Sequence, residues 1–333
     1  MMIDLRERNP MKQLAACLFS CLAILFAMSV SISASAQSKA DWRTTLGVFR
    51  VGIVTGDASV LAARRAEPFR VALQDALGLP VELFPVRQEA RLIDALKASR
   101  IEYAILSTSA FAIAQKTCKC AEPLVSPQTP GGIRAIHSVL YAPAALSGSV
   151  ESFAGKTIII PGKRSFSGYQ APLHFFGERG YRLGSAQWPL LDAETATEAA
   201  KALLAGDGQA LFGWKSEDVD GSSPASTSRE TLAILRDLSG KESDAFAAIW
   251  QSPPLRFGPH VVRPNLHQDA KAILLRVLRN LKQQDRDAYD AIEPDFGGGF
   301  VPASIADYSD LVRVLPEQTV TPPKQDANET DQP

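Results

Sequence analysis

Cysteine and histidine are scarce in this sequence, and their spacing argues against a metal centre. The 333 residues include four cysteines and four histidines. The histidines are scattered along the chain at His137, His174, His260 and His267, and they do not have the ligand spacing of a zinc site. We therefore expect no metal and no cofactor. Beyond residue 36 the cysteines are Cys118 and Cys120. Such a pair can oxidise outside the cytoplasm, although so short a loop is strained, and the sequence leaves their oxidation state open.

Several catalytic motifs are also absent. The sequence has no G-x-S-x-G elbow, no H-E-x-x-H, no Walker A loop and no G-x-G-x-x-G. The glycine-rich stretch 296–300 follows a predicted helix and lacks lysine, so it is interpreted as a turn. Lys163 near Ser165 does not have the spacing of a serine–lysine nucleophile, and a solvated lysine is the better interpretation. These absences predict that the protein is not an enzyme.

Strong charge of either sign is missing as well. The formal net charge is −1 at pH 7, and no basic tract occurs along the chain. This composition excludes a typical nucleic-acid-binding protein. A small anionic ligand would have to be held by local hydrogen-bond donors, because no global positive field attracts it.

The first 36 residues have the layout of a secretory signal peptide. Charged residues up to Lys12 precede an apolar run over residues 14–30, and small residues end at Ala36. The run is short for a membrane-spanning helix, although a retained membrane anchor stays an alternative. We predict a signal peptide over residues 1–36 and a periplasmic protein. The polar, proline-containing stretch 316–333 predicts a disordered tail.

Alternating strand and helix patterns fill the first part of the remaining chain. They predict strands at 48–54, 81–86 and 101–106, and helices at 60–77, 90–98 and 109–116. This order is typical of a mostly parallel sheet with helices on its faces.

A second α/β series begins after residue 150. It includes predicted strands at 157–160, near Trp188 and at 209–213, with helices between them. The chain leaves the first half near Tyr141 and returns near Val261, which predicts two lobes. We expect lobe 1 over 45–140 and 262–315, lobe 2 over 141–261, and a ligand between the lobes.

The most informative stretch lies between the strand 157–160 and the helix that follows it. It contains Ser165, Phe166, Ser167, Gly168 and Tyr169. A hydroxyl-rich loop at a helix start offers backbone N–H groups and the positive end of the helix dipole, which suits an anion. The alternative is an ordinary helix cap, because serine is a preferred N-cap residue.

A matching loop, Ser107-Thr108-Ser109, follows the strand 101–106 in the first half. Two such loops, one in each half, could face each other across a cleft, and this favours the anion site over the cap. Trp214 follows the strand 209–213 and could form a wall of the same cleft. The alternative is a packing tryptophan beside a solvated Lys215.

These residues resemble a known family. Residues 149–157, the run Ser165-Phe166-Ser167-Gly168-Tyr169 and the nearby Pro172-Leu173 are similar to the periplasmic phosphate/phosphite/phosphonate-binding proteins of ABC transporters. The resemblance covers roughly residues 48–290. It implies a bilobed α/β type II periplasmic-binding-protein fold, with two mixed sheets joined by a two-strand hinge. It also implies that Ser165, Ser167 and Gly168 grip phosphonate oxygens, and it places the family's other ligand-facing positions at Glu89, Phe111 and Gln209.

The sequence thus predicts an exported solute-binding protein that captures a small oxyanion, phosphonate- or phosphate-like, between two lobes for an ABC permease. One alternative is a sensor of the same fold that partners a membrane histidine kinase. Another is a binder of a non-oxyanion metabolite, a possibility to which Glu89, Phe111 and Trp214 point. We expect a monomer and no nucleic-acid partner.

Overall fold

The computed structural model describes residues 41–56, 59–217 and 230–315. The predicted signal peptide and the predicted tail lie outside these ranges. Helix α2 (Trp42–Leu46) belongs to one compact unit, and the residues from Gly47 onward form a second unit. None of the helices within the described ranges is long and apolar enough to cross a membrane.

The first sheet of the larger unit has six strands. Their order is β12 (Phe300–Pro302), β4 (Glu122–Pro127), β11 (His260–Val262), β3 (Tyr103–Ile105), β1 (Phe49–Val54) and β2 (Val81–Val86). Strand β1 is parallel to β2 and β3, whereas β11 is antiparallel to β3 and β4. The predicted α/β order is present, but the sheet is mixed because β11 is inserted from a distant part of the chain.

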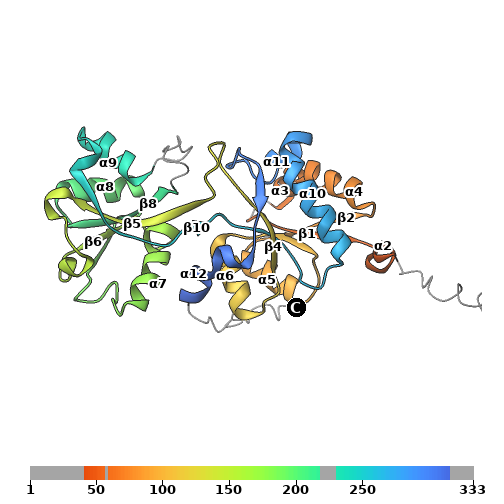
Figure 1. Ribbon diagram of the computed structural model, residues 1–333, viewed down its shortest axis with the longest axis horizontal. Helices are drawn as coiled ribbons and strands as arrows, with labels where there is room; N and C mark the ends of the chain where they lie inside the picture. The colour runs from red at the N-terminus through yellow and green to blue at the C-terminus, as the bar shows by residue number, and fades with distance from the viewer. Residues whose placement is uncertain (1–40, 57–58, 218–229, 316–333) are drawn as a thin grey trace, which may run out of the picture. The chain divides into compact units, whose positions relative to one another are not determined.

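Helices cover both faces of this sheet (Figure 1). On one face, α5 (Glu89–Lys97) and α6 (Thr108–Thr117) bury their apolar sides against residues such as Ala104 and Val261. The other face carries α4 (Glu67–Leu77), α10 (Gln268–Gln284) and α11 (Arg286–Asp290), which contact one another or the strands. Two further helices are α3 (Ser59–Arg65) and α12 (Ser309–Val314).

The second sheet contains six further strands. Its main order is β10 (Leu255–Arg256), β5 (Ala135–Pro143), β8 (Ala210–Ser216), β6 (Ile158–Ile160) and β7 (Leu190–Asp192), and β9 (Phe246–Gln251) also pairs with β5. Strand β6 is parallel to β7 and β8, and β5 is antiparallel to β8. This sheet is therefore mixed too.

Successive residues of β6 point to opposite faces of the second sheet. Ile158 and Ile160 pack in the cluster that includes α7 (Ala171–Glu178), whereas Ile159 packs with α8 (Ala196–Ala205) and α9 (Thr231–Ser239). Figure 1 shows α7 on one side of the strands and α8 and α9 on the other. All three isoleucines are fully buried, as expected for a strand covered on both faces.

The chain passes between the two sheets twice, through residues 128–134 and 257–259. The sequence placed these passages later, near Tyr141 and Val261. Strand β5 pairs with β8 from Ile136 to Tyr141, so it belongs to the second sheet over its whole length. Its buried side chains alone could not show which of the two sheets it joins.

Cys118 and Cys120 form a disulfide after the end of α6, with their Cα atoms 5.1 Å apart. This bond answers the question of oxidation state that the sequence left open. Cys120 belongs to the buried core beneath α5 and α6, and Cys118 packs against this core.

Candidate functional site

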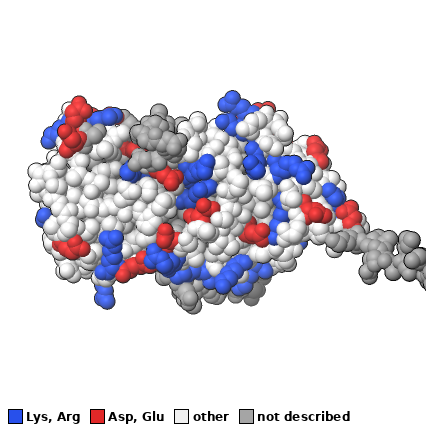
Figure 2. Space-filling model, in the orientation of Figure 1, with Lys and Arg blue, Asp and Glu red and all other residues white. Residues whose placement is uncertain are grey.

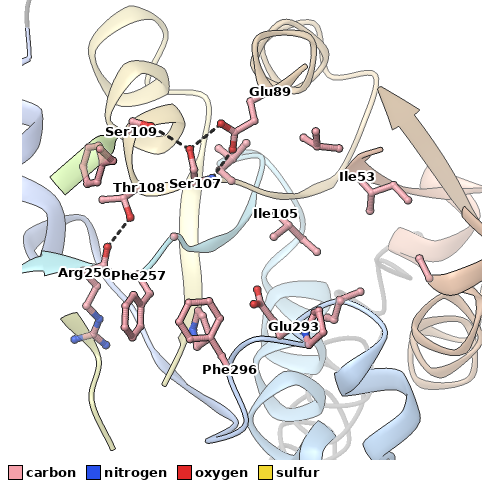
Figure 3. A pocket seen from close by; sticks show the side chains of 18 of the residues that line it. Ile53, Glu89, Ile105, Ser107, Thr108, Ser109, Arg256, Phe257, Glu293 and Phe296 are labelled. Atoms are coloured by element: carbon pink, nitrogen blue, oxygen red, sulfur yellow. Dashed lines mark hydrogen bonds between the residues drawn. The ribbon is translucent and has the colours of Figure 1, made fainter. Parts of the chain in front are cut away.

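Two cavities lie at the two hydroxyl-bearing loops. The larger has a volume of about 740 Å³ and is lined by the loop Ser107-Thr108-Ser109 together with Glu89 and Phe166 (Figure 3). The smaller has a volume of about 210 Å³ and is lined by Ser165, Ser167, Gly168 and Trp214. Each loop therefore borders a cavity large enough for a tetrahedral anion.

The larger cavity is built at the carboxyl ends of two parallel strands. Ile53 and Val54 end β1, Ile105 ends β3, and all three line the cavity. Phe257 and Phe296 form another part of the lining, with their ring centroids 4.5 Å apart. Ligands bind at this edge in open α/β sheets, because the loops that follow the strands converge there.

A carboxylate already occupies the N-terminus of α6 in this cavity. The Ser107 backbone N–H donates to Glu89 Oε1 at 2.6 Å, and the Ser107 hydroxyl donates to Glu89 Oε2 at 2.7 Å. Ser107 is also the N-cap of α6, since its Oγ accepts from the Ala110 N–H at 3.2 Å. Figure 3 shows Glu89 pointing at Ser107, with Ser109 on the other side of the hydroxyl. The two donors of Ser107, its N–H and its hydroxyl, are thus bonded to the protein's own acid.

The Ser165 loop is arranged differently. Ser165 Oγ accepts from the Gly168 N–H at 3.0 Å, and the Ser165 carbonyl accepts from the N–H groups of Tyr169 and Gln170. A π-helical turn, Phe166–Gln170, then leads into α7. Within the described residues, the Phe166 N–H, the Ser167 N–H and the Ser167 hydroxyl have no hydrogen-bond partner. These three donors remain available for a ligand.

Two contacts hold this loop in place. The Ser138 hydroxyl on β5 donates to the Ser167 carbonyl at 2.5 Å, and Ser138 is fully buried. Gly168 lies so close to Pro161 that an added Cβ would be 2.3 Å from the Pro161 Cγ. Glycine is therefore required here for the loop to close over the end of β6.

The predicted site residues fall into three groups: those that line the smaller cavity, those that line the larger cavity and those that line neither. The smaller cavity is lined by Ser165, Ser167, Gly168 and Trp214, and the larger is lined by Glu89, Ser107, Thr108, Ser109 and Phe166. Phe166 lies between Ser165 and Ser167 in the chain, so one loop borders both cavities. Neither of these two cavities is lined by Phe111, Tyr169 or Gln209.

Phe111 and Gln209 have structural roles, which corrects the prediction that both face the ligand. Phe111 is 0% exposed, and its ring centroid lies 4.6 Å from that of Tyr308. Gln209 comes just before β8 and accepts the Thr157 N–H through Oε1 at 2.9 Å. Because β8 and β6 are parallel and Thr157 comes before β6, Gln209 lies at the opposite end of these strands from the Ser165 loop. Tyr169 packs against the core of the second sheet.

Sequence reasoning missed Arg65, Phe257, Glu293 and Phe296 as lining residues of the larger cavity. Phe296 belongs to the glycine-rich stretch interpreted as a turn. One signal was available there, the run of three glycines at 297–299. The structure gives its reason at Gly298, which approaches the carbonyls of Gln128 and Thr129 too closely for any side chain. No sequence pattern distinguished Arg65 or Glu293 from other helical or surface charges.

Glu293 joins the cavity to a buried polar chain. Its Oε1 lies 2.7 Å from His260 Nε2, and the His260 Nδ1 is hydrogen-bonded to the Tyr103 hydroxyl. A carboxylate on Glu293 accepts the Nε2 proton, which leaves Nδ1 to accept from Tyr103. Burial, with the neighbouring Glu293 charge, raises the pKa of Tyr103 well above its usual value. This chain fixes the Glu293 carboxylate. Figure 3 shows Glu293 among the side chains that line the cavity.

Comparison with known proteins identifies the family. Residues 51–308 match the sequence profile described as ABC transporter, phosphonate, periplasmic substrate-binding protein. The chain belongs to this family. Its members are transport solute-binding proteins and not enzymes, they act in the periplasm, and they present small-molecule ligands to a membrane permease. The resemblance that we drew from the Ser165 loop and its neighbours is confirmed.

Solved structures agree on the fold. XAC2383 from Xanthomonas citri bound to ATP is 16% identical, with a TM-score of 0.56, over 80% of this chain and 95% of that one. Its chloride-bound structure is 17% identical, with a TM-score of 0.52, over 80% and 96% of the two chains. The comparison with curated proteins gave no match. The expected fold, a bilobed type II periplasmic-binding-protein fold with two mixed sheets, is confirmed.

Proposed function

We propose that this protein captures a small oxyanion, phosphonate- or phosphate-like, on the Ser165 loop and delivers it to an ABC permease. The observation that carries the proposal is the set of three available donors on that loop, the N–H groups of Phe166 and Ser167 and the Ser167 hydroxyl. They stand at the start of a helical segment, where the helix dipole favours negative charge.

The local donors have to provide most of the affinity. The net charge of the chain is −1, and Figure 2 shows basic and acidic side chains interspersed over the face in view. A hydrogen bond to a charged ligand contributes roughly 1.5–3 kcal/mol. Two or three such bonds in a cavity of about 210 Å³ suit a tetrahedral group better than a large ligand. The larger cavity next to the loop then accommodates whatever substituent the oxyanion carries.

Isothermal titration calorimetry with the purified mature protein tests the proposal. The ligands are phosphate, phosphite, methylphosphonate and sulfate, with ATP added because the similar XAC2383 structure contains it. We expect saturable binding of at least one oxyanion and a raised melting temperature in its presence. If none of these anions binds or shifts the melting temperature, the oxyanion assignment is wrong.

We also propose that residues 1–36 form a cleaved signal peptide, that the mature protein is monomeric and that residues 316–333 are disordered. Expression of the full chain in a Gram-negative host and mass spectrometry of the periplasmic fraction test the cleavage. We expect a chain that begins at Gln37. Retention of the protein in the membrane fraction would favour an uncleaved anchor.

A non-oxyanion metabolite is the second candidate ligand. Glu89 favours it, because its carboxylate holds the donors of Ser107 that an anion would need. Under this alternative, the Ser165 loop is a helix cap and the ligand lies in the larger cavity. A metabolite whose affinity is unchanged by replacing Ser167 with alanine would support it. A sensor kinase as the membrane partner is compatible with either ligand and is tested by co-purification with the kinase or the permease.

A further inference from the structure

Glu89 holds the hydrogen-bond donors of Ser107 in the wall of the larger cavity. Both of its carboxylate oxygens accept from Ser107, one from the N–H at 2.6 Å and one from the hydroxyl at 2.7 Å. Ser109 adds a hydroxyl contact to Ser107 at 3.1 Å. The N-cap residue of α6 therefore already has a charge-complementary partner, and that partner is part of the wall of the larger cavity.

The other charged groups of the cavity do not reverse this polarity near Glu89. Glu293 is 7% exposed and adds a second carboxylate, held by His260. The Arg256 guanidinium donates to Ser126 Oγ at 3.0 Å and to the Pro302 carbonyl at 3.2 Å, and it lies 3.6 Å from Asp307. Figure 3 shows this guanidinium pointing away from Glu89.

Arg65 is the remaining basic residue in the lining of the cavity. It is exposed, so its charge is largely screened by solvent and salt. Glu89 and Glu293 are therefore the hydrogen-bonded charges in the described lining, apart from Arg256, whose guanidinium is turned away from Glu89 and bonded elsewhere.

We infer that Glu89 is a specificity-determining residue that rejects ligands with a second negative charge. The inference rests on the proposed function. The oxyanion binds at the Ser165 loop, and the substituent that enters the larger cavity carries no negative charge. The substrate class is thus a phosphonate or phosphate ester with an uncharged or basic substituent, and diacids are excluded by like-charge repulsion at Glu89.

A matched ligand pair tests the inference by calorimetry. Phosphonoacetate carries a carboxylate where phosphonoacetamide, which has almost the same shape, carries a neutral amide. We expect the wild-type protein to bind phosphonoacetate at least about tenfold more weakly than phosphonoacetamide, because a carboxylate that enters the larger cavity past Phe166 shares this cavity with the Glu89 carboxylate and is repelled by it. In Glu89→Gln the side-chain amide oxygen still accepts from Ser107, and the ratio should fall to within about threefold of one.

Asp94→Asn is the control variant, because Asp94 is an acid of the same helix, lies in neither cavity and pairs with Arg91 at 3.9 Å. It should keep the wild-type ratio. If Glu89→Gln does not fold, Glu89→Ser provides a neutral residue that suits the first turn of α5. A wild-type ratio near one needs no variant for its interpretation, whereas a high ratio is assigned to Glu89 by the variants.

The possible outcomes distinguish a failure of the role inferred for Glu89 from a failure of the proposed oxyanion-binding function. A wild-type ratio near one overturns the role of Glu89, as does a high ratio that Glu89→Gln leaves unchanged. Both results leave the oxyanion function intact, because the neutral phosphonate still binds. If neither member of the pair nor any other oxyanion binds, the proposed function fails and the inference fails with it.

Discussion

The roles of Ser165 and Ser167 can be separated by single alanine substitutions. Ser165 Oγ accepts the Gly168 N–H at 3.0 Å, so it is the N-cap of the turn that begins at Phe166. The Ser167 hydroxyl has no partner among the described residues. We therefore expect Ser165→Ala to lower stability, whereas Ser167→Ala lowers affinity for the oxyanion and leaves stability unchanged.

The magnitudes follow from these contacts. Loss of a serine N-cap costs about 1 kcal/mol, within a range of roughly 0.5–2 kcal/mol. For a protein of this size the melting temperature should fall by about 2–4 °C per kcal/mol. Loss of a hydrogen bond to a charged ligand costs about 1.5–3 kcal/mol, which corresponds to a Kd about 10- to 100-fold higher for Ser167→Ala.

Differential scanning calorimetry without ligand and titration calorimetry with the best oxyanion give the two readouts. Ser152→Ala is a suitable control, because the Ser152 hydroxyl donates to the Ser149 carbonyl in an exposed turn that lines neither cavity. The reasoning is refuted if Ser167→Ala destabilises the free protein as much as Ser165→Ala, or if it binds the oxyanion like the wild type. Either result would make the whole loop a helix cap.

Three further predictions concern residues outside the Ser165 loop. Gly258→Ala should lower the free energy of unfolding by about 1–3 kcal/mol in a urea titration, because the added Cβ would lie 2.2 Å from the Leu106 carbonyl oxygen. Gly177→Ala is the control: the space around Gly177 is open, so this change should be neutral or stabilising. Gln209→Ala should cost about 1 kcal/mol of stability and leave oxyanion affinity unchanged; a weaker Kd would return this residue to the ligand site. The stability of the protein should fall as pH rises above about 10, because the Tyr103 hydroxyl then ionises in the unfolded chain but stays protonated in the folded protein. Urea midpoints measured across this pH range should fall less steeply in Tyr103→Phe than in the wild type. An equal fall would contradict the raised pKa of Tyr103.

Much of the fold was predictable from local patterns. The run of three isoleucines at 158–160 has the β-branched, uniformly apolar character of a strand covered on both faces, and it forms β6. The predicted strand 48–54 is β1 from Phe49 to Val54, with buried side chains at alternate positions. The pairing of β5 was not predictable, because its neighbours β8 and β10 lie about 70 and 120 residues further along the chain.

Site residues were predictable where the strand–loop–helix order alone places them. The Ser107 and Ser165 loops follow β3 and β6 at their carboxyl ends, and both border cavities. Phe111 was misplaced for a reason that periodicity could have revealed. It lies on the apolar side of α6 together with Ala110 and Ala114, and this side packs into the core rather than toward a ligand.

The two hydroxyl loops look equivalent in the sequence, yet their chemistry differs. What separates them is a residue outside both loops. Glu89 opens α5, eighteen residues before Ser107, and β2 and α5 bring it to the N-terminus of α6. Among the described residues, no acidic side chain bonds to the Ser165 loop, so its donors stay open. A local motif can therefore indicate where an anion could bind, but whether the protein has already filled that place depends on contacts that only the tertiary fold creates.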